Sequence, residues 1–269
     1  MILNAEVSQL ARRHRVSDKT IEKDYVLTWI LAQLGKRVLN DSLLFKGGTA
    51  IKKAYFQNYR FSEDLDFTLE GNASDQEIQN ALSMVFKDLL DQAGIECRLQ
   101  KTETNAEGSL TLFVSYVGPL QARDSDRNLK VDITRGELVL DKPVKKKILS
   151  DYSDLKDARK TVLCYTPLEI LIEKLAAIGS PHRREPRDLY DLHYLFDHLS
   201  FDDDAILELY DQKARHKKQD PRDLLKVLDR KSSSYEKLWH VRLDGLVPNL
   251  PEFEATLRSI KRRIRAFLD

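Results

Sequence analysis

The fold is decided by residues 64–69, which read DLDFTL. Polar and apolar residues alternate here, and this period is typical of a β-strand with one face in the core. Because successive strand side chains point to opposite faces, Asp64 and Asp66 share the polar face while Leu65 and Phe67 pack inward. Two adjacent carboxylates repel each other, so the pair indicates a divalent cation, and Mg²⁺ (or Mn²⁺) prefers such oxygen ligands. Taken alone, the same pattern also fits an exposed acidic strand end.

A glycine turn precedes this strand. Residues 43–45 predict a short buried strand, Gly47, Gly48 and Thr49 follow it, and a helical pattern continues to Tyr55. Glycines let backbone N–H groups approach a phosphate, and a helix N-terminus adds a favourable dipole. The Thr49 hydroxyl can donate a further hydrogen bond. A simple tight turn would also explain the two glycines, but the order strand, turn, helix and acidic strand indicates a nucleotide-binding site.

A third carboxylate, Asp132, lies on another predicted strand. Residues 130–133 read KVDI, so Val131 and Ile133 are expected to face the core and Asp132 the opposite side. If this strand neighbours the first, Asp132 completes a three-carboxylate metal site and can orient or deprotonate an acceptor hydroxyl. We assign Lys130 to nucleotide binding. An aspartate on an edge strand is the alternative interpretation.

The remaining patterns predict an α+β fold. A helix over 74–94, with a Ser74–Glu77 capping box and a Gly94 stop, is the clearest element. After Pro143 the pattern favours helices almost to the end. We therefore expect a small mixed β-sheet with flanking helices, followed by a C-terminal helical bundle, with domains at 1–155 and 156–269. Helices are also expected at 7–11 and 21–34, and strands at 95–100, 109–116 and 129–134.

The first two helices could form a helix-turn-helix DNA reader. The second of them is mostly apolar over residues 26–31, so we expect it to be buried instead of lying in a groove.

A series of short motifs lies at residues 21–25, 45–50, 60–67, 130–132, 169–175 and 187–192. Taken together in this order, they resemble the AbiEii/AbiGii-type toxin family, bacterial nucleotidyltransferases with a DNA-polymerase-β-like core that include the MenT-type toxins. The resemblance covers roughly residues 20 to 200 and leaves the role of the tail open. It implies that residues 1–155 form a nucleotidyltransferase core with N-terminal helices.

This resemblance implies further site residues. Lys174 stands among apolar neighbours, where a charged amine is costly to bury unless it meets an anion, and the family role is to bind the triphosphate. Asp188 lies in the first turn of a helix opened by Pro186, and the resemblance places it in the catalytic site. Glu169 belongs to a Thr166 capping box, so we leave it out of the site.

The resemblance also implies the reaction. We expect transfer of a nucleoside monophosphate from a nucleoside triphosphate to an acceptor, an RNA 3′ end such as that of tRNA. The chain would be the toxin of a type IV-like toxin–antitoxin or phage-defence system, with a cognate antitoxin. The alternatives are nucleotidylation of a protein target and a non-catalytic nucleotide-binding interaction module.

Composition limits the other function classes. The formal net charge is +1 over 269 residues, so the chain as a whole is no polycation. Three basic runs, residues 145–147, 213–218 and 258–265, are solvated faces or a surface for a phosphate-rich partner. No apolar run reaches the roughly 20 residues that span a bilayer, and no signal pattern opens the chain, so we expect a cytoplasmic protein. Cys97 and Cys164 indicate neither a disulfide framework nor a zinc site.

Overall fold

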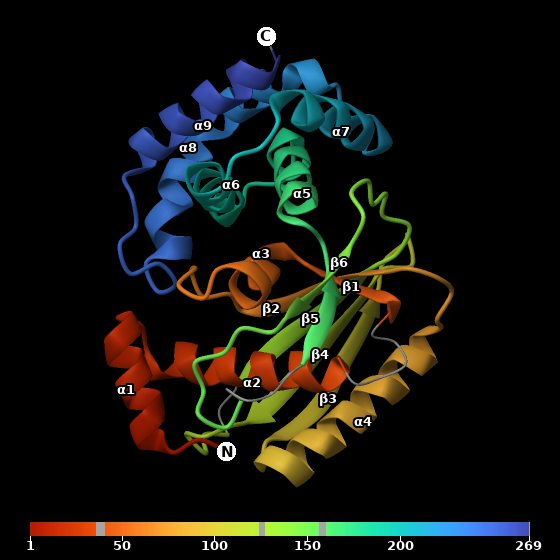
Figure 1. The fold of residues 1–269 in the computed structure, drawn as a ribbon, viewed down its shortest axis with the longest axis vertical. Coiled ribbons are helices and arrows are strands. Elements are labelled where there is room, and N and C mark those ends of the chain that lie inside the picture. The colour runs from red at the N-terminus through yellow and green to blue at the C-terminus, as the bar shows by residue number, and fades with distance from the viewer. Residues whose placement is uncertain (36–40, 124–126, 156–159, 269) are drawn as a thin grey trace. The chain divides into compact units, whose positions relative to one another are not determined.

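The chain folds into two compact units in a computed structural model that describes residues 1–35, 41–123, 127–155 and 160–268 (Figure 1). The first unit comprises Met1–Glu137 and Pro143–Tyr165, and the second comprises Leu138–Lys142 and Thr166–Asp269. The sequence placed a boundary at 155/156, beside residues 156–159, which lie outside the described residues. The short segment Leu138–Lys142 belongs to the second unit, and no sequence pattern indicated this.

The first unit is built on a seven-stranded mixed sheet with the order β3-β4-β5-β2-β1-β7-β6. The pair β2–β5 and the pair β1–β7 are parallel, and the other neighbours are antiparallel. The strands are β1 Leu43–Lys46, β2 Asp64–Leu69, β3 Glu96–Thr104, β4 Leu110–Val117, β5 Asn128–Thr134, β6 Val144–Lys147 and β7 Thr161–Cys164.

Helices cover one face of this sheet, where α2 crosses the strands and α4 lies along β3. Ser17 caps α2 by accepting from the Thr20 N–H, and the predicted Ser74–Glu77 capping box opens α4. Helix α2 is buried along most of its length, so the helix-turn-helix alternative is wrong. The helices of this unit are α1 Asn4–His14, α2 Asp18–Leu34, α3 Gly47–Ala50, the π-helical turn η2 Ile51–Tyr55, and α4 Asp75–Ala93.

The prediction of helices from Pro143 onward is wrong at two described segments, which form strands. The lysine run at 145–147 forms the edge strand β6, and Thr161–Cys164 forms β7 between β6 and β1. Lysines on an edge strand hinder pairing with another chain, which explains this basic run without a nucleic-acid partner. Lys145 forms an exposed ion pair with Asp41 at 2.9 Å.

The second unit is helical, as predicted. Its core holds the fully buried aromatic side chains of Tyr210, Tyr235 and Trp239. Helix α9 contributes an apolar stripe that includes Leu257, Ile260 and Ile264. The helices are α5 Pro167–Gly179, α6 Pro186–His198, α7 Asp203–His216, the 3-10 turn η3 Pro221–Asp223, α8 Leu224–Leu243 and α9 Phe253–Leu268.

A buried ion pair fastens the Leu138–Lys142 segment to this bundle. The carboxylate of Glu169 accepts from the backbone N–H groups of Leu140 and Asp141, at 3.0 and 2.8 Å, and contacts Lys213 Nζ at 2.7 Å. Thr166 caps α5 by accepting from the Glu169 N–H, as the predicted capping box requires. The other half of that prediction is wrong, because the Glu169 carboxylate accepts from the Leu138–Lys142 segment. Lys213 has no exposed side-chain area, and its inclusion in a basic surface run is wrong.

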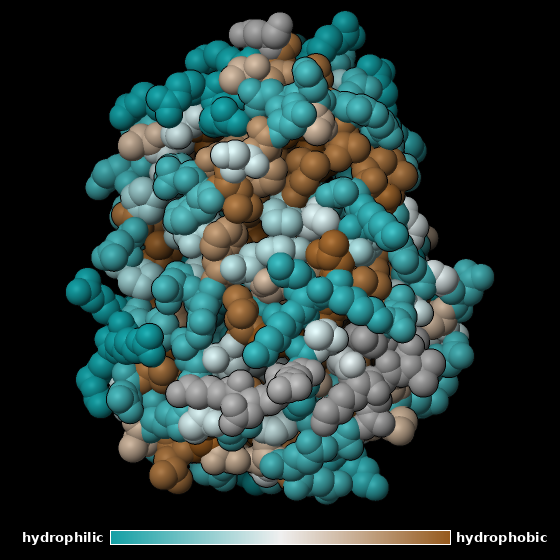
Figure 2. All heavy atoms as spheres, in the orientation of Figure 1, coloured by the Kyte–Doolittle hydropathy of each residue, from teal (hydrophilic) through white to brown (hydrophobic). Residues whose placement is uncertain are grey.

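The surface fits a well-solvated protein. Hydrophilic side chains cover most of the face in Figure 2, with hydrophobic groups scattered between them. Among the described helices, none is long and apolar enough to cross a membrane.

Candidate active site

The three predicted carboxylates stand on neighbouring strands of the first unit. The parallel register of β2 and β5 pairs Asp66 with Asp132 and Asp64 with Lys130. On the other side of β2, Lys46 of β1 is the register partner of Asp66. Leu65, Val131 and the other alternate residues of both strands are buried, so the carboxylates share the opposite face, as the alternation predicted.

Thr111 of β4 fixes the orientation of Asp132. Its hydroxyl donates to Asp132 Oδ1 at 2.5 Å, and the two residues are register partners. Asp132 is half-buried, as are Asp64 and Asp66. A threonine opposite an acidic residue is a common strand pairing, and no sequence signal singled it out.

The glycine turn packs directly against Asp66. Gly47 has a φ of +75°, a left-handed conformation that favours glycine, and a Cβ at this position would overlap the Asp66 carboxylate. A Cβ on Gly48 would overlap the guanidinium of Arg60. Gly47 is therefore favoured both by its backbone conformation and by the close approach of Asp66, whereas a side chain at position 48 would displace the Arg60 guanidinium. The turn opens α3, and the first N–H groups of a helix have no partner within the helix.

Thr49 has a different contact from the one expected. Its hydroxyl donates to the backbone carbonyl of Asp64 at 2.5 Å, which ties the turn to the start of the acidic strand. Thr49 is buried, with 1% of its surface exposed. In this arrangement it acts by holding the strand to the turn.

Arg60 and Lys46 are charged residues of the site that the sequence reasoning missed. Arg60 is buried, its Nη1 donates to the Phe61 carbonyl at 3.0 Å, and its guanidinium packs on Gly48. Lys46 is also buried, with Nζ 3.9 Å from Glu137 Oε2. Their position inside the glycine and acidic motifs was the available signal, because a buried cation beside a glycine turn attracts phosphate.

Lys174 and Asp188 lie in the second unit and contact each other. Lys174 Nζ is 2.7 Å from Asp188 Oδ1 and 2.8 Å from Asp191 Oδ2, and both carboxylates are buried. The anion that Lys174 meets in the folded chain is thus a pair of aspartates. Arg183, which the sequence did not single out, donates through Nε to Asp188 Oδ2 at 2.5 Å. We refer to Lys174, Arg183, Asp188 and Asp191 as the lysine–aspartate cluster.

The charge balance of this cluster keeps Asp188 ionised. Burial alone would raise the pKa of its carboxyl, but the charges and hydrogen bonds of Lys174 and Arg183 outweigh burial and lower it.

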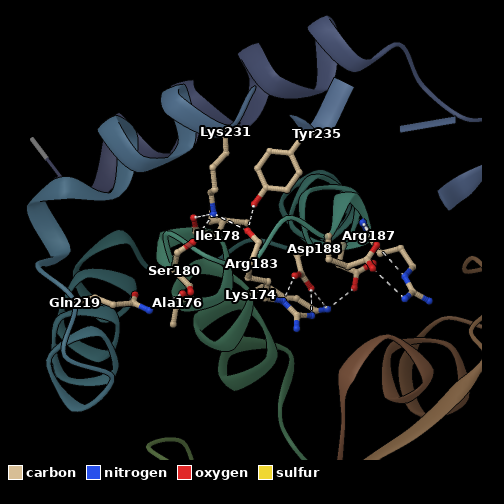
Figure 3. Close-up of polar contacts among 12 residues, drawn as sticks. Lys174, Ala176, Ile178, Ser180, Arg183, Arg187, Asp188, Gln219, Lys231 and Tyr235 are labelled. Atoms are coloured by element: carbon tan, nitrogen blue, oxygen red, sulfur yellow. Dashed lines mark hydrogen bonds and ion pairs between the residues drawn. The ribbon is translucent and has the colours of Figure 1, made fainter. Parts of the chain in front are cut away.

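Lys231 of α8 holds the loop that carries Arg183. Its ammonium donates to the carbonyls of Ile178, Ser180 and Arg183, at 2.5, 2.7 and 3.0 Å. Figure 3 shows this side chain reaching the loop beside Tyr235, while Asp188 lies on the far side of the same loop with Lys174. Three carbonyls around one ammonium fix the loop between α5 and α6, and thereby the backbone from which Arg183 reaches Asp188.

The predicted residues thus form two sets. Asp64, Asp66, Asp132 and the glycine turn are brought together in the first unit, and Lys174 and Asp188 are brought together in the second. Among the residues that the structure describes, no group of three or more His, Cys, Asp or Glu side chains is arranged to hold a metal ion. The donor chemistry nevertheless fits a hard cation, since three carboxylates share one face of two adjacent strands.

Solved structures with the same architecture define the class. MenT4, a nucleotidyltransferase toxin from Mycobacterium tuberculosis H37Rv, matches with a TM-score of 0.72 and 21% identity, over 100% of this chain and 90% of its own. JHP933 from Helicobacter pylori matches with a TM-score of 0.60 and 19% identity, over 94% of this chain and 93% of its own. The fold is therefore that of a nucleotidyltransferase.

The family follows from the sequence. The family model described as nucleotidyl transferase AbiEii toxin, type IV TA system, matches residues 29–263. The chain belongs to this family of nucleotidyltransferase toxins, which confirms the resemblance inferred from the motifs. The match extends beyond residue 200, where the motifs had stopped, so the C-terminal helices are part of the family architecture. No curated protein sequence matches the chain significantly.

Proposed function

We propose that this nucleotidyltransferase moves a nucleoside monophosphate from a nucleoside triphosphate to the 3′ end of an RNA such as tRNA, in a reaction that requires Mg²⁺ or Mn²⁺. The observation that carries the proposal is the register that sets Asp132 beside Asp66, with Gly47 packed against the Asp66 carboxylate. The carboxylates that would hold a cation are thus adjacent to the glycine turn that would bind phosphate, and transfer from a triphosphate needs this arrangement.

The residues of the first unit divide the work. The N–H groups of the glycine turn and the charge of Arg60 would bind the phosphates. Asp64, Asp66 and Asp132 would hold the cation, which supplies charge neutralisation at the phosphates when bound. Asp132 would accept the proton of the acceptor hydroxyl, whose oxygen forms a bond to the α-phosphorus. The bond from the α-phosphorus to the bridging oxygen breaks, and pyrophosphate leaves with that oxygen.

In the second unit, Lys174 would bind the triphosphate, and Asp188 would act on the reaction through Lys174. The supporting observation is the pair of buried carboxylates that hold the lysine ammonium, together with its 12% exposed side chain. An ammonium oriented in this way can meet a phosphate oxygen without searching rotamers. We therefore assign Asp188 and Asp191 to positioning.

The exposed part of the basic tail is our candidate for holding the body of the RNA. Lys213 no longer belongs to this surface, but Lys217 and Lys218 are exposed, and so is one side of α9. That side carries Arg258, Arg262 and Arg265. The chain would act as the toxin of a toxin–antitoxin or phage-defence pair whose antitoxin controls this activity.

The direct test supplies the purified protein with each α-labelled nucleoside triphosphate, Mg²⁺ and total tRNA. We expect label in RNA, lost with EDTA and with Asp66→Asn. Absence of label in RNA from the wild type would overturn the RNA acceptor.

A protein acceptor is the second candidate, and the same reaction separates the two. Label that survives RNase but not protease would assign the transfer to a protein side chain. The third alternative, an interaction module without turnover, is disfavoured because the chain belongs to an enzyme family and retains all three carboxylates.

A further inference from the structure

The sheet face that carries the active-site carboxylates continues across β5, β4 and β3. The register sets Asp64, Lys130, Phe113 and Lys101 side by side on four neighbouring strands. Alternate residues of β4, including Leu112 and Val114, are buried in the core, so Phe113 lies on the opposite side of the sheet from that core. A continuous surface thus leads from the carboxylates to the β3 edge.

Phe113 is a half-exposed aromatic ring between two ammonium groups. Lys130 Nζ is 5.4 Å and Lys101 Nζ is 5.9 Å from the ring centroid. The Lys101 side chain is 64% exposed. Both ammonium groups lie over the ring, and an aromatic ring accompanied by cations suits a ligand that has both a π face and negative charge.

The next residues along the strands extend this chemistry. Arg98 pairs with Ser115 in the register, one row beyond Phe113, and its side chain is 74% exposed. Arg98, Gln100 and Ser115, with Arg123, line a groove of about 160 Å³. We call Arg98, Lys101, Phe113, Ser115 and Lys130 the β-face strip.

Toward the β3 edge, the charged side chains that the structure describes form ion pairs with one another. Glu103 pairs with Lys101, and Glu96 pairs with Arg98 and Arg123. With Lys130, these described side chains are four cations and two carboxylates, next to the active-site carboxylate of Asp64. Ion pairs with such exposed side chains contribute little to stability, so a phosphate can replace a carboxylate at small cost.

We propose that the β-face strip binds the single-stranded end of the acceptor RNA, with a base stacked on Phe113 and phosphates on Arg98 and Lys101. This rests on the proposed function and specifies where its acceptor lies. Two strand spacings, about 10 Å, separate Phe113 from Asp64. An RNA end with a base stacked on the Phe113 ring therefore lies within reach of the carboxylates. Stacking is sequence-tolerant, so the strip would accept several RNA ends.

The test measures binding and turnover separately. Fluorescence anisotropy with labelled oligoadenylate of about ten nucleotides reports binding without any reaction. Phe113→Leu keeps an apolar side chain but removes the ring, and Arg98→Gln with Lys101→Gln removes charge. Phe86→Leu with Lys87→Gln makes the same kinds of change on α4, which covers the opposite face.

We expect Phe113→Leu to weaken oligoadenylate binding about tenfold. Arg98→Gln with Lys101→Gln should reduce the slope of log affinity against log salt by about 0.7 for each phosphate that the protein no longer neutralises. In turnover with tRNA, both variants should raise the KM for tRNA and leave the KM for the nucleoside triphosphate unchanged. The α4 variant should match the wild type throughout.

Two outcomes are distinguished. If the wild type labels RNA and the strip variants bind and react as the wild type does, the β-face strip is not the acceptor site, and the proposed function stands. If the wild type labels no RNA, the proposed RNA acceptor is wrong, and so is the β-face strip as its binding site. A thermal melt of each variant shows whether a raised KM reflects unfolding.

Discussion

Asp66 on β2 and Asp132 on β5 are register partners on adjacent parallel strands, although 66 positions separate them in the chain. Their neighbours Leu65, Phe67, Val131 and Ile133 are buried, so the strands cannot slip by one residue without exposing their core faces. The core therefore fixes the distance between the two carboxylates before any ligand binds.

Replacing either carboxylate should abolish transfer while the fold persists. Asp66→Asn or Asp132→Asn should lower kcat/KM by at least about a hundredfold, because the amide no longer neutralises a cation. The unfolding free energy should change by less than about 1 kcal/mol at these half-buried sites. Steady-state kinetics and urea titration measure the two effects. Glu70→Gln, one residue past β2, is the control. Equal activity of Asp66→Asn and Glu70→Gln would show that Asp66 is not part of the site.

Gly47→Ala should lose activity beyond the cost of backbone strain. A left-handed alanine costs about 1–2 kcal/mol, and here its Cβ also displaces the Asp66 carboxylate. Gly136 has a similar φ of +67° with nothing within 4 Å of a Cβ, so Gly136→Ala isolates the strain. Thermal melts and transfer rates of both variants give the comparison. A similar loss of activity in both would show that the contact with Asp66 is irrelevant.

Lys231→Met should disorder the loop between α5 and α6. Removal of the ammonium leaves the buried carbonyl of Ile178 and the part-buried carbonyls of Ser180 and Arg183 without this donor, at a cost of about 1–3 kcal/mol. We also expect a higher KM for the nucleoside triphosphate, because Arg183 and Lys174 lose their fixed position. Lys226→Met, an exposed lysine of the same helix, is the matched control. A variant with wild-type KM would confine Lys231 to a structural role.

Asp188 should give the protein part of its acid sensitivity. Its pKa is lowered in the folded chain from the ordinary value of 3.8, so the unfolded chain takes up this proton at higher pH. The stabilising contribution is thus complete above pH 3.8 and is lost as the pH falls through the folded-state pKa. Urea titrations of the wild type and Asp188→Asn should give a difference in unfolding free energy that shrinks on acidification. A difference independent of pH would contradict the lowered pKa.

The two ends of the basic run at 213–218 should behave differently. Lys213→Gln leaves Glu169 buried without its cation and should destabilise the fold by about 3–5 kcal/mol. Lys217→Gln with Lys218→Gln, at exposed positions, should leave the melting temperature unchanged and reduce the salt dependence of RNA binding. If the double variant binds RNA like the wild type, this end of the run lies outside the RNA surface.

Local patterns predicted the elements that have strong local signals. The acidic strand at 64–69 and the capped helix at 74–94 were found because alternation, capping box and glycine stop all lie within the element. The strands β6 and β7 were missed because each has four residues, and β7 is a strand only through its pairing with β1 and β6.

The site shows the same division. Alternation predicted the common face of Asp64 and Asp66, but the neighbour relation of β2 and β5 is non-local, so Asp132 could only be placed conditionally. Burial of Lys213 depends on Glu169, which lies 44 positions earlier, and no spacing rule connects them. The contact of Arg60 with Gly48 likewise depends on the path of the chain between them.

The Leu138–Lys142 segment has a practical consequence for dissecting the protein. Because its amides satisfy the Glu169 carboxylate, a fragment that starts at Thr166 would keep an interior acid and lose two of its donors. The chain passes between the units three times, so no single cut yields two complete halves. A polypeptide that begins at Leu138, with a short linker in place of residues 143–165, would contain the helical bundle together with the Leu138–Lys142 segment.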